Sequence, residues 1–278
     1  VAIVETGTAH SLPYVLTLLS ELSLTPQQVK YVIPTHVHLD HAGGAGVMMQ
    51  AFPNAELVIH PAGAKHMIDP SVLVQSTIDV YGEVVFKKLY GKIPPVDASR
   101  VNAAEHESVV KLHDRELLIV HTPGHAYHHF CVVDERSKGI FTGDTFGLAY
   151  PNLIYQQKRI VIPTTTPTQF DHSALLSSID LLMSFAPEKM YMTHFNVLPD
   201  PASVVDMLKL WIEKYVALTL EVKPLDSSGI TELTNKMGKM IACDFDIDQH
   251  IIENQLAVDI KLNAQGLCYW YKKQHAAI

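Results

Sequence analysis

Cysteine is scarce in this chain of 278 residues, which has three, Cys131, Cys243 and Cys268. They lie far apart and form neither a CxxC pair nor the even-numbered framework of a disulfide-stapled domain. This distribution indicates buried or half-buried free thiols in a reducing compartment. It disfavours a structural zinc site made of cysteines.

Long apolar runs and blocks of basic residues are also missing. No stretch approaches the roughly 20 apolar residues that a membrane-spanning helix needs, and no signal peptide is recognised. The formal net charge is −8, and Lys and Arg form no block, which disfavours nucleic acid or an anionic membrane as a partner. We therefore expect a cytoplasmic protein with neither kind of partner.

The first 200 residues alternate short apolar runs with helix-like segments. Runs such as "VAIVE", "KYVIP", "AELVIH", "ELLIVH", "CVVDE", "GIFTGDT" and "KMYMTH", bounded by Gly, Pro or Asp, predict strands. Apolar residues at helical spacing predict helices over 11–22, 44–52 and 174–185. The order of these elements predicts an α/β fold.

The pattern changes after residue 200. Four successive helices are expected, over 203–222, 229–242, 248–262 and 263–274. We therefore predict one domain over residues 1–200 and a helical C-terminal extension over 201–278. Residues 66–100 are less regular, with a helix expected at 81–91. Because the chain opens inside a strand, we expect further strands before Val1.

The stretch "THVHLDHAGG" crowds His36, His38, Asp40 and His41 behind an apolar strand. Alternate side chains of an extended segment point the same way, so the first two histidines can converge on one metal ion. Asp40 and His41, past the strand end, can turn toward a second ion. Imidazole and carboxylate without a thiolate suit Zn, Fe, Mn or Ni.

Three later residues, His125, Asp144 and His194, also follow predicted strands. Functional residues of open α/β proteins gather at such strand ends. All seven residues are therefore expected at one edge of the sheets.

The HxHxDH motif with the later His, Asp and His resembles the metallo-β-lactamase superfamily over about residues 1–200. The resemblance implies a four-layer αβ/βα sandwich with the site at one sheet edge. It also implies metal ligands: His36, His38 and His125 for the first ion, Asp40, His41 and His194 for the second, and Asp144 as the bridge.

One departure from the family bears on the activity. Zinc β-lactamases have cysteine where this chain places Asp144, so antibiotic hydrolysis is not expected. With an aspartate there, the motif is similar to glyoxalase II-like thioester hydrolases, lactonases and phosphodiesterases. It is also similar to the oxygen-binding diiron proteins of the superfamily. Flavodiiron proteins, which have Glu at the position of His38, fit less well.

We expect a dinuclear metallo-hydrolase acting on a small-molecule ester, thioester, lactone or phosphodiester. Two divalent ions about 3.5–4 Å apart can share a bridging hydroxide that attacks the substrate, with Asp40 as the catalytic residue that orients it or takes its proton. The expected ions are Zn or Fe, with Mn as a further candidate. If they are iron, the alternative is a diiron protein that binds or reduces O2, and a third alternative is a purely structural metal site.

Other residues are weaker candidates. His66, Tyr150 and Tyr155 are candidates for lining the substrate pocket, and the favoured alternative places them in solvated surface segments. The run "GGAG" lacks the third glycine of a dinucleotide loop and the Lys of a phosphate loop, so no nucleotide or flavin is expected. The aromatic residues at 269–271 are expected to pack between helices or to form a homodimer contact.

Overall fold

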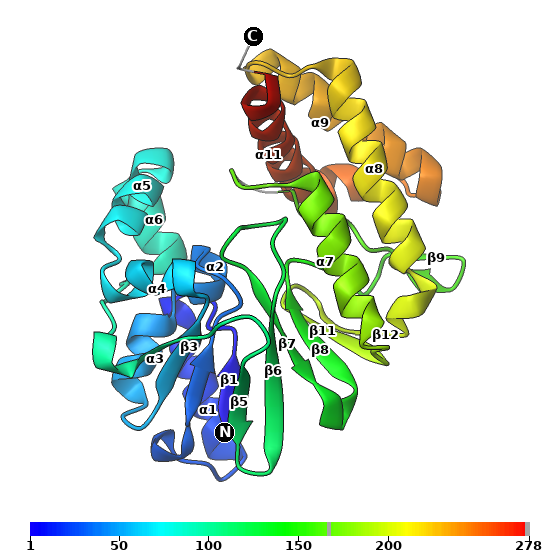
Figure 1. The fold of residues 1–278 in the computed structure, drawn as a ribbon. Coiled ribbons are helices and arrows are strands. Elements are labelled where there is room, and N and C mark those ends of the chain that lie inside the picture. The colour runs from blue at the N-terminus through cyan, green and yellow to red at the C-terminus, as the bar shows by residue number, and fades with distance from the viewer. Residues whose placement is uncertain (166–167, 276–278) are drawn as a thin grey trace. The chain divides into compact units, whose positions relative to one another are not determined.

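The computed structural model describes residues 1–165 and 168–275. The chain folds into two compact units that are interleaved in sequence. Unit 1 consists of Val1–His121 and His128–Ser137, and unit 2 of Thr122–Tyr127 and Lys138–Ile278. Figure 1 shows the course of the chain through both.

Unit 1 contains two sets of strands. The first is a parallel sheet in the order β1-β2-β3-β4, and the second is an antiparallel run β5-β6-β7. The strands are β1 (Ala2–Val4), β2 (Tyr31–Ile33), β3 (Glu56–Ile59), β4 (Val101–Ala103), β5 (Val109–Leu112), β6 (Arg115–His121) and β7 (Phe130–Asp134). Because β1 and β2 run parallel and in register, their carboxyl ends lie side by side.

Helices of unit 1 cover the parallel sheet. They are α1 (Leu12–Glu21), α2 (Leu39–Ala42), α3 (Ala45–Ala51), α4 (Pro61–Ile68), α5 (Ser71–Tyr81) and α6 (Glu83–Tyr90). Single 3-10 turns lie at Ala9–Ser11, Pro26–Gln28, Ala98–Arg100 and Glu135–Ser137. Ala45, Met48, Met49 and Phe52, spaced at i, i+3, i+4 and i+7, are all buried. This stripe packs α3 onto the core that contains Leu57 of β3.

Unit 2 combines strands with a bundle of helices. Strand β8 (Gly139–Gly143) pairs in parallel with β11 (Lys189–Met192), which pairs antiparallel with β12 (Asn196–Pro199). A small hairpin joins β9 (Ile154–Tyr155) to β10 (Lys158–Arg159). The helical elements are α7 (His172–Ser184), a 3-10 turn (Pro201–Ser203), α8 (Val205–Val222), α9 (Ser227–Phe245), α10 (Gln249–Ile251), a π-helical turn (Ile252–Leu256) and α11 (Ala257–His275).

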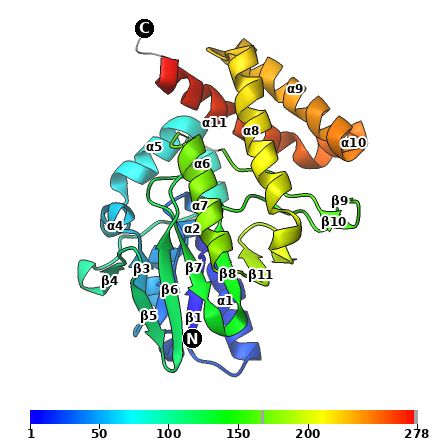
Figure 2. The same ribbon diagram turned by 45° about the vertical axis from the view of Figure 1, so that its right-hand side comes forward.

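Helices α8, α9 and α11 pack against one another, as Figures 1 and 2 show. Each contributes an apolar stripe to their common core, for example Trp211, Leu233 and Leu267, all at most 2% exposed. The Trp211 ring also stacks on Phe245, with centroids 4.7 Å apart. Burying each such side chain contributes about 1.5–3 kcal/mol to the stability of the bundle.

Most predicted elements are present. All seven predicted strand segments contain a strand, and Asp171 caps α7 by accepting a hydrogen bond from the Ala174 N–H. One prediction was wrong: the helices expected at 248–262 and 263–274 are not separate, because α11 runs without interruption through Asn263. The segment 66–100, for which we predicted less regular structure and one helix at 81–91, contains α5, α6 and the end of α4.

None of the helices within the described residues is long and apolar enough to cross a membrane.

Candidate metal centre

His36, His38, Asp40 and His41, called here the unit 1 cluster, lie just beyond β2. The chain leaves the strand in an extended segment and then enters the short helix α2, which carries Asp40 and His41. Nε2 of His36 lies 2.7 Å from Nδ1 of His38. The His36 and His41 ring centroids are 4.1 Å apart, and both rings are fully buried. The carboxylate of Asp40, 53% exposed, has Oδ2 3.5 Å from Nε2 of His41.

Glu5, at the end of β1, contacts this cluster although sequence analysis did not select it. Its Oε1 accepts a hydrogen bond of 2.6 Å from the Thr35 hydroxyl and lies 3.2 Å from Nδ1 of His41. The Thr35 Oγ1 in turn lies 3.0 Å from Nδ1 of His36. Because the Thr35 hydroxyl donates to Glu5, its oxygen can accept from Nδ1 of His36, and the Glu5 carboxylate faces Nδ1 of His41. In this arrangement Nε2 of each ring is the nitrogen left for a metal.

The backbone of Glu5 is strained as well. Its φ is +68°, which a residue with a side chain adopts only at a cost of about 1 kcal/mol or more. Its N–H donates to the Ile33 carbonyl at 3.0 Å, and the next N–H, of Thr6, donates to the His41 carbonyl at 2.9 Å. Main-chain hydrogen bonds to β2 and to α2 thus fix Glu5 beside the cluster. The sequence does contain a signal for Glu5: it is an acidic residue that directly follows β1, and β1 runs parallel to β2, the strand before the HxHxDH motif.

His128 and His129 lie beside His36 as well. Both are buried, and the His129 ring centroid is 4.8 Å from that of His36. Nδ1 of His128 accepts a long hydrogen bond of 3.5 Å from the Val37 N–H. Both histidines therefore lie where they can support a ligand from outside the unit 1 cluster.

His125, Asp144 and His194, called here the unit 2 cluster, lie at strand or loop ends within unit 2. Asp144 follows β8 and His194 follows β11, which is its parallel neighbour, so the two residues lie at the same edge. One carboxylate oxygen of Asp144, Oδ2, is 3.4 Å from Nε2 of His125. The other, Oδ1, is 3.4 Å from Nε2 of His194. Asp144 therefore offers a separate oxygen to each imidazole.

Hydrogen bonds from hydroxyl groups hold this cluster's backbone. The Thr164 hydroxyl donates to the Asp144 carbonyl at 2.7 Å, and the Ser178 hydroxyl of α7 donates to the Pro123 carbonyl at 2.6 Å. The second bond anchors the turn that carries His125. These contacts restrict the positions of two of the three predicted ligands.

The predicted pocket residues lie in different surroundings. The Tyr150 ring stacks on Phe195, with centroids 3.8 Å apart, and its hydroxyl donates to Oδ2 of Asp259 at 2.6 Å. Burial and then this carboxylate raise the pKa of Tyr150, so the hydroxyl stays a donor. Tyr155, in β9, packs edge-to-face on Phe245. His66 is half-buried near the end of α4. Their contact with a substrate stays a prediction.

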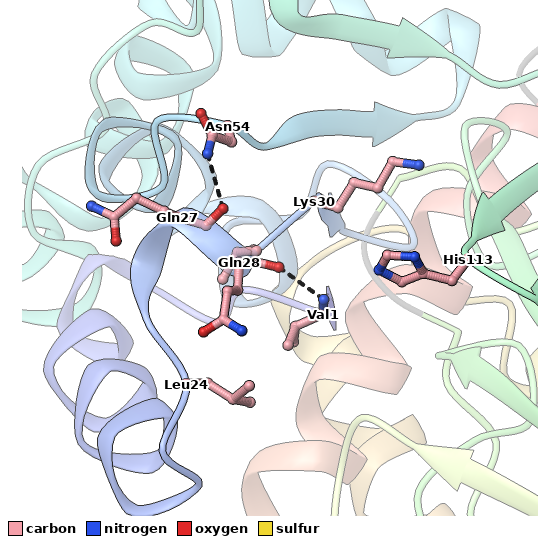
Figure 3. Close-up of a pocket in the computed structure, with 8 residues that line it drawn as sticks. Val1, Leu24, Gln27, Gln28, Lys30, Asn54 and His113 are labelled. Carbon is pink, nitrogen blue, oxygen red and sulfur yellow. Dashed lines mark hydrogen bonds between the residues drawn. The ribbon is translucent and has the colours of Figure 1, made fainter.

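A cavity of about 380 Å³ lies at another place in unit 1 (Figure 3). It is lined by Val1, Leu24, Gln27, Gln28, Val29, Lys30, Asn54 and His113. Its lining residues include none of the predicted site residues. Two hydrogen bonds of 2.9 Å, from Asn54 to the Gln27 carbonyl and from the Val1 amino group to the Gln28 carbonyl, close one side of it.

A histidine pair outside the unit 1 cluster has a clear pH consequence. Nδ1 of His60 accepts the Ala62 N–H at 3.1 Å and caps α4, and its ring lies 4.0 Å from that of His121. Burial and then the charge of His121 lower the pKa of His60 to about 4. The unfolded chain, with a His pKa of about 6.5, therefore binds more protons than the folded chain between these values. The stabilising contribution is complete above that range and is lost as the pH falls through it.

Lowering the pH from 7 to 4.5 should reduce the free energy of unfolding of both the natural chain and His60→Asn. We expect this reduction to be about 1–2 kcal/mol larger in the natural chain, a value that allows for the partial exposure of the ring. The Asn side chain keeps an acceptor for the Ala62 N–H and does not titrate. Urea denaturation of both proteins at several pH values measures the difference. Parallel pH dependences would contradict the assignment.

The fold is of the α/β class, and both clusters lie beyond the ends of its strands. Their histidine and carboxylate side chains are suited to divalent transition metals. The chain belongs to the metallo-beta-lactamase superfamily, whose family model matches residues 1–194. The predicted fold class, including the helical C-terminal region, is confirmed.

Individual relatives show how far the likeness reaches. The metallo-beta-lactamase fold-containing protein ST1585 of Sulfurisphaera tokodaii is 26% identical over 191 residues, which cover 67% of this chain and 68% of that protein. The acyl-coenzyme A thioesterase MBLAC2 of Gallus gallus is 31% identical over 118 residues, 40% of each protein. The chain thus spans less than half of that thioesterase.

Solved structures support the fold. The metallo-beta-lactamase family protein TTHA1429 of Thermus thermophilus superposes with a TM-score of 0.63 at 18% identity, covering 99% of this chain and 85% of that one. At this level of identity the match shows the fold and not the activity.

Proposed function

We propose that this chain is a metal-dependent hydrolase of a small-molecule acyl compound, a thioester, ester or lactone, with phosphodiesters as a less favoured substrate class. The thioesterase among its relatives supports the acyl class. The metal ligands are the seven residues of the two clusters. Their assignment to one dinuclear centre rests on the resemblance to the superfamily.

The observation that carries the proposal is the placement of Asp144. Its two carboxylate oxygens lie 3.4 Å from Nε2 of two different histidines, His125 and His194. A carboxylate can bridge two metal ions with one oxygen on each, and Asp144 has a separate oxygen beside each of the two histidines. The buried Asp134, by contrast, accepts hydrogen bonds from two donors, Arg115 and the Ser137 hydroxyl.

The donor set fits divalent transition metals. His36, His41 and His125 are fully buried, and the protein places carboxylates beside them. The contacts of Glu5 and Thr35 hold Nδ1 of His36 and His41 and leave Nε2 for coordination. Metal ions bound to such ligands would supply Lewis acidity toward a carbonyl oxygen and lower the pKa of water.

Side chains of the protein would transfer the proton and orient the ligands. Asp40 is half-exposed, and its carboxylate would accept a proton from an attacking water. The water oxygen bonds to the acyl carbon, the bond to the sulfur or oxygen of the leaving group breaks, and the leaving group takes up the proton. Glu5 and Thr35 keep the histidines oriented throughout.

Metal analysis and a substrate panel test the proposal. The purified chain, prepared with and without oxygen, is analysed for Zn, Fe and Mn per chain. It is then assayed with an acyl-coenzyme A, an acyl-homoserine lactone and bis(p-nitrophenyl) phosphate. We expect about two divalent ions per chain, hydrolysis of at least one acyl substrate, loss of activity with a chelator and recovery when metal is added back.

Two results would overturn this function. One is a chain that binds no divalent metal under either condition. The other is iron-loaded protein that hydrolyses no member of the panel but shows an absorption band that changes in air. The second result would establish the diiron alternative.

A further inference from the structure

The backbone immediately after His194 is strained. Phe195 and Asn196 have φ values of +74° and +79°, and neither is glycine. A positive φ costs Phe195 about 1–2 kcal/mol and costs Asn196 less, because asparagine adopts this conformation more readily and its Oδ1 accepts a hydrogen bond of 2.7 Å from the Val197 N–H. Both residues follow His194 at the short turn between the antiparallel strands β11 and β12, where Met192 pairs with Asn196, so the conformation of this turn affects the direction of the His194 side chain.

An aromatic stack holds the Phe195 ring of this turn. The Phe195 ring lies on the Tyr150 ring, with centroids 3.8 Å apart and planes tilted by 28°. The Tyr150 hydroxyl donates to Oδ2 of Asp259 at 2.6 Å and lies 3.5 Å from the Gln255 carbonyl. Tyr150 is therefore held at both ends, by the ring of Phe195 and by the C-terminal helical segment.

The helical segment that contacts Tyr150 carries a regular series of polar residues. Gln255, Asp259 and Asn263 recur every four residues and form a polar stripe on one helical face. Gln255 exchanges two hydrogen bonds of 2.9 Å with Asn152. Asn263 accepts from the Thr165 N–H at 2.7 Å and donates to the Pro163 carbonyl at 2.8 Å. All three thus bind the connection that follows Asp144.

The helix changes its winding where the stripe begins. Residues Ile252–Leu256 form a π-helical turn, which contains Gln255 and leads directly into α11. Single π turns inside helices frequently accompany functional sites, because the extra residue rotates the following side chains. Here the turn precedes the two stripe residues that α11 carries, Asp259 and Asn263.

We propose that Asp259, Tyr150 and Phe195 form a brace through which the C-terminal helix positions His194 for metal binding. Asp259 holds the Tyr150 hydroxyl, Tyr150 holds the Phe195 ring, and Phe195 holds the backbone that sets the direction of His194. This inference rests on the proposed function, in which His194 is a ligand. It makes these three positioning residues and gives Tyr150 a role other than direct contact with substrate.

Zinc titration of the chelator-stripped full chain tests the brace. Tyr150→Phe removes the bond to Asp259 and keeps the stack, whereas Phe195→Gly removes the stack and accepts the positive φ without strain. We expect the more weakly held zinc ion to bind about 10-fold more weakly in Tyr150→Phe and up to about 100-fold more weakly in Phe195→Gly. Asp259→Asn, which keeps an acceptor oxygen, should lie closer to the natural chain than Asp259→Ala.

Two control variants separate positioning from general stability. Tyr271→Phe removes a hydroxyl from a tyrosine of the C-terminal helix itself, whose ring centroid lies 4.3 Å from that of His275, and it should bind zinc normally. Leu233→Val, in the core of the helical bundle, should lower the melting temperature without weakening zinc binding. The absorption spectrum of the cobalt-loaded proteins gives a second readout, since it follows the coordination geometry and should change only in the brace variants.

The outcomes distinguish the two proposals. If the natural chain binds no zinc or cobalt, the proposed function fails, and the brace fails with it. If the natural chain binds metal but Tyr150→Phe and Phe195→Gly bind it with natural affinity and spectrum, the brace is wrong and the proposed function stands.

Discussion

Replacing Asp144 by Ala is expected to lower metal content from about two ions per chain to one or none and to reduce any hydrolysis more than about 100-fold. Loss of a group that only supports a ligand costs 10–100-fold, and Asp144 itself is the proposed ligand to both ions. Its oxygens each lie 3.4 Å from a histidine, so its removal also leaves His125 and His194 without their shared neighbour. Metal analysis after dialysis and the substrate panel measure both effects.

Asp134 provides the matched control. It is also a buried aspartate at the end of a strand, β7, and it pairs with Arg115 and the Ser137 hydroxyl. Although burial opposes its ionisation, these two partners hold the pKa of Asp134 below its usual value. Asp134→Asn should therefore lower stability by about 3 kcal/mol or more through the broken ion pair and leave the metal content unchanged. Equal metal loss in both variants would contradict the assignment of Asp144.

The strand-end positions of the proposed ligand residues could be predicted, because they depend on local order. His36, Asp144 and His194 each follow a run that forms a strand, and strands β8 and β11 pair in parallel. A polar residue after each of two parallel neighbours must lie at one edge. Sequence position therefore predicts proximity without knowledge of any side-chain contact.

Glu5 and Asn263 were harder to interpret, because their roles depend on distant partners. Glu5 contacts Thr35 and His41 only because β1 pairs with β2 and the backbone adopts a positive φ. Asn263 suggested the start of a new helix, since asparagine favours caps over helix interiors. In the structure Thr165 and Pro163 satisfy its side chain, and the helix continues through it.

The helix α5 was missed for a different reason. Its sequence "SVLVQSTIDVY" is rich in Val, Ile and Thr, which have lower helix propensity because they are branched at Cβ. Only weak apolar periodicity remains, and Val72 is 69% exposed. Packing against α4 and α6 decides the conformation here, and such contacts are not visible in local sequence.

Gly124, the residue before His125, is expected to tolerate no side chain. Its φ is +133°, and an added Cβ would lie 2.3 Å from the backbone N and Cα of Leu175 in α7. Its carbonyl also accepts the Asp171 N–H at 2.8 Å, which joins this turn to the cap of α7. Neither atom of Leu175 can move without displacing the helix, so the cost combines steric overlap with backbone strain.

We expect Gly124→Ala to lower the free energy of unfolding by more than about 3 kcal/mol and to weaken metal binding, because the turn that carries His125 must shift. Gly82→Ala is the matched control: Gly82 also has a positive φ, +79°, but an added Cβ there would meet nothing within 4 Å. It should cost about 1–3 kcal/mol, the strain alone, and leave metal binding unchanged. Urea denaturation and zinc titration of both variants measure the two effects. If both variants lose the same free energy of unfolding, backbone strain dominates and α7 moves to accommodate the new methyl group. If Gly124→Ala loses much more than Gly82→Ala, the loss comes from the close approach of Gly124 to α7, which holds His125 in place.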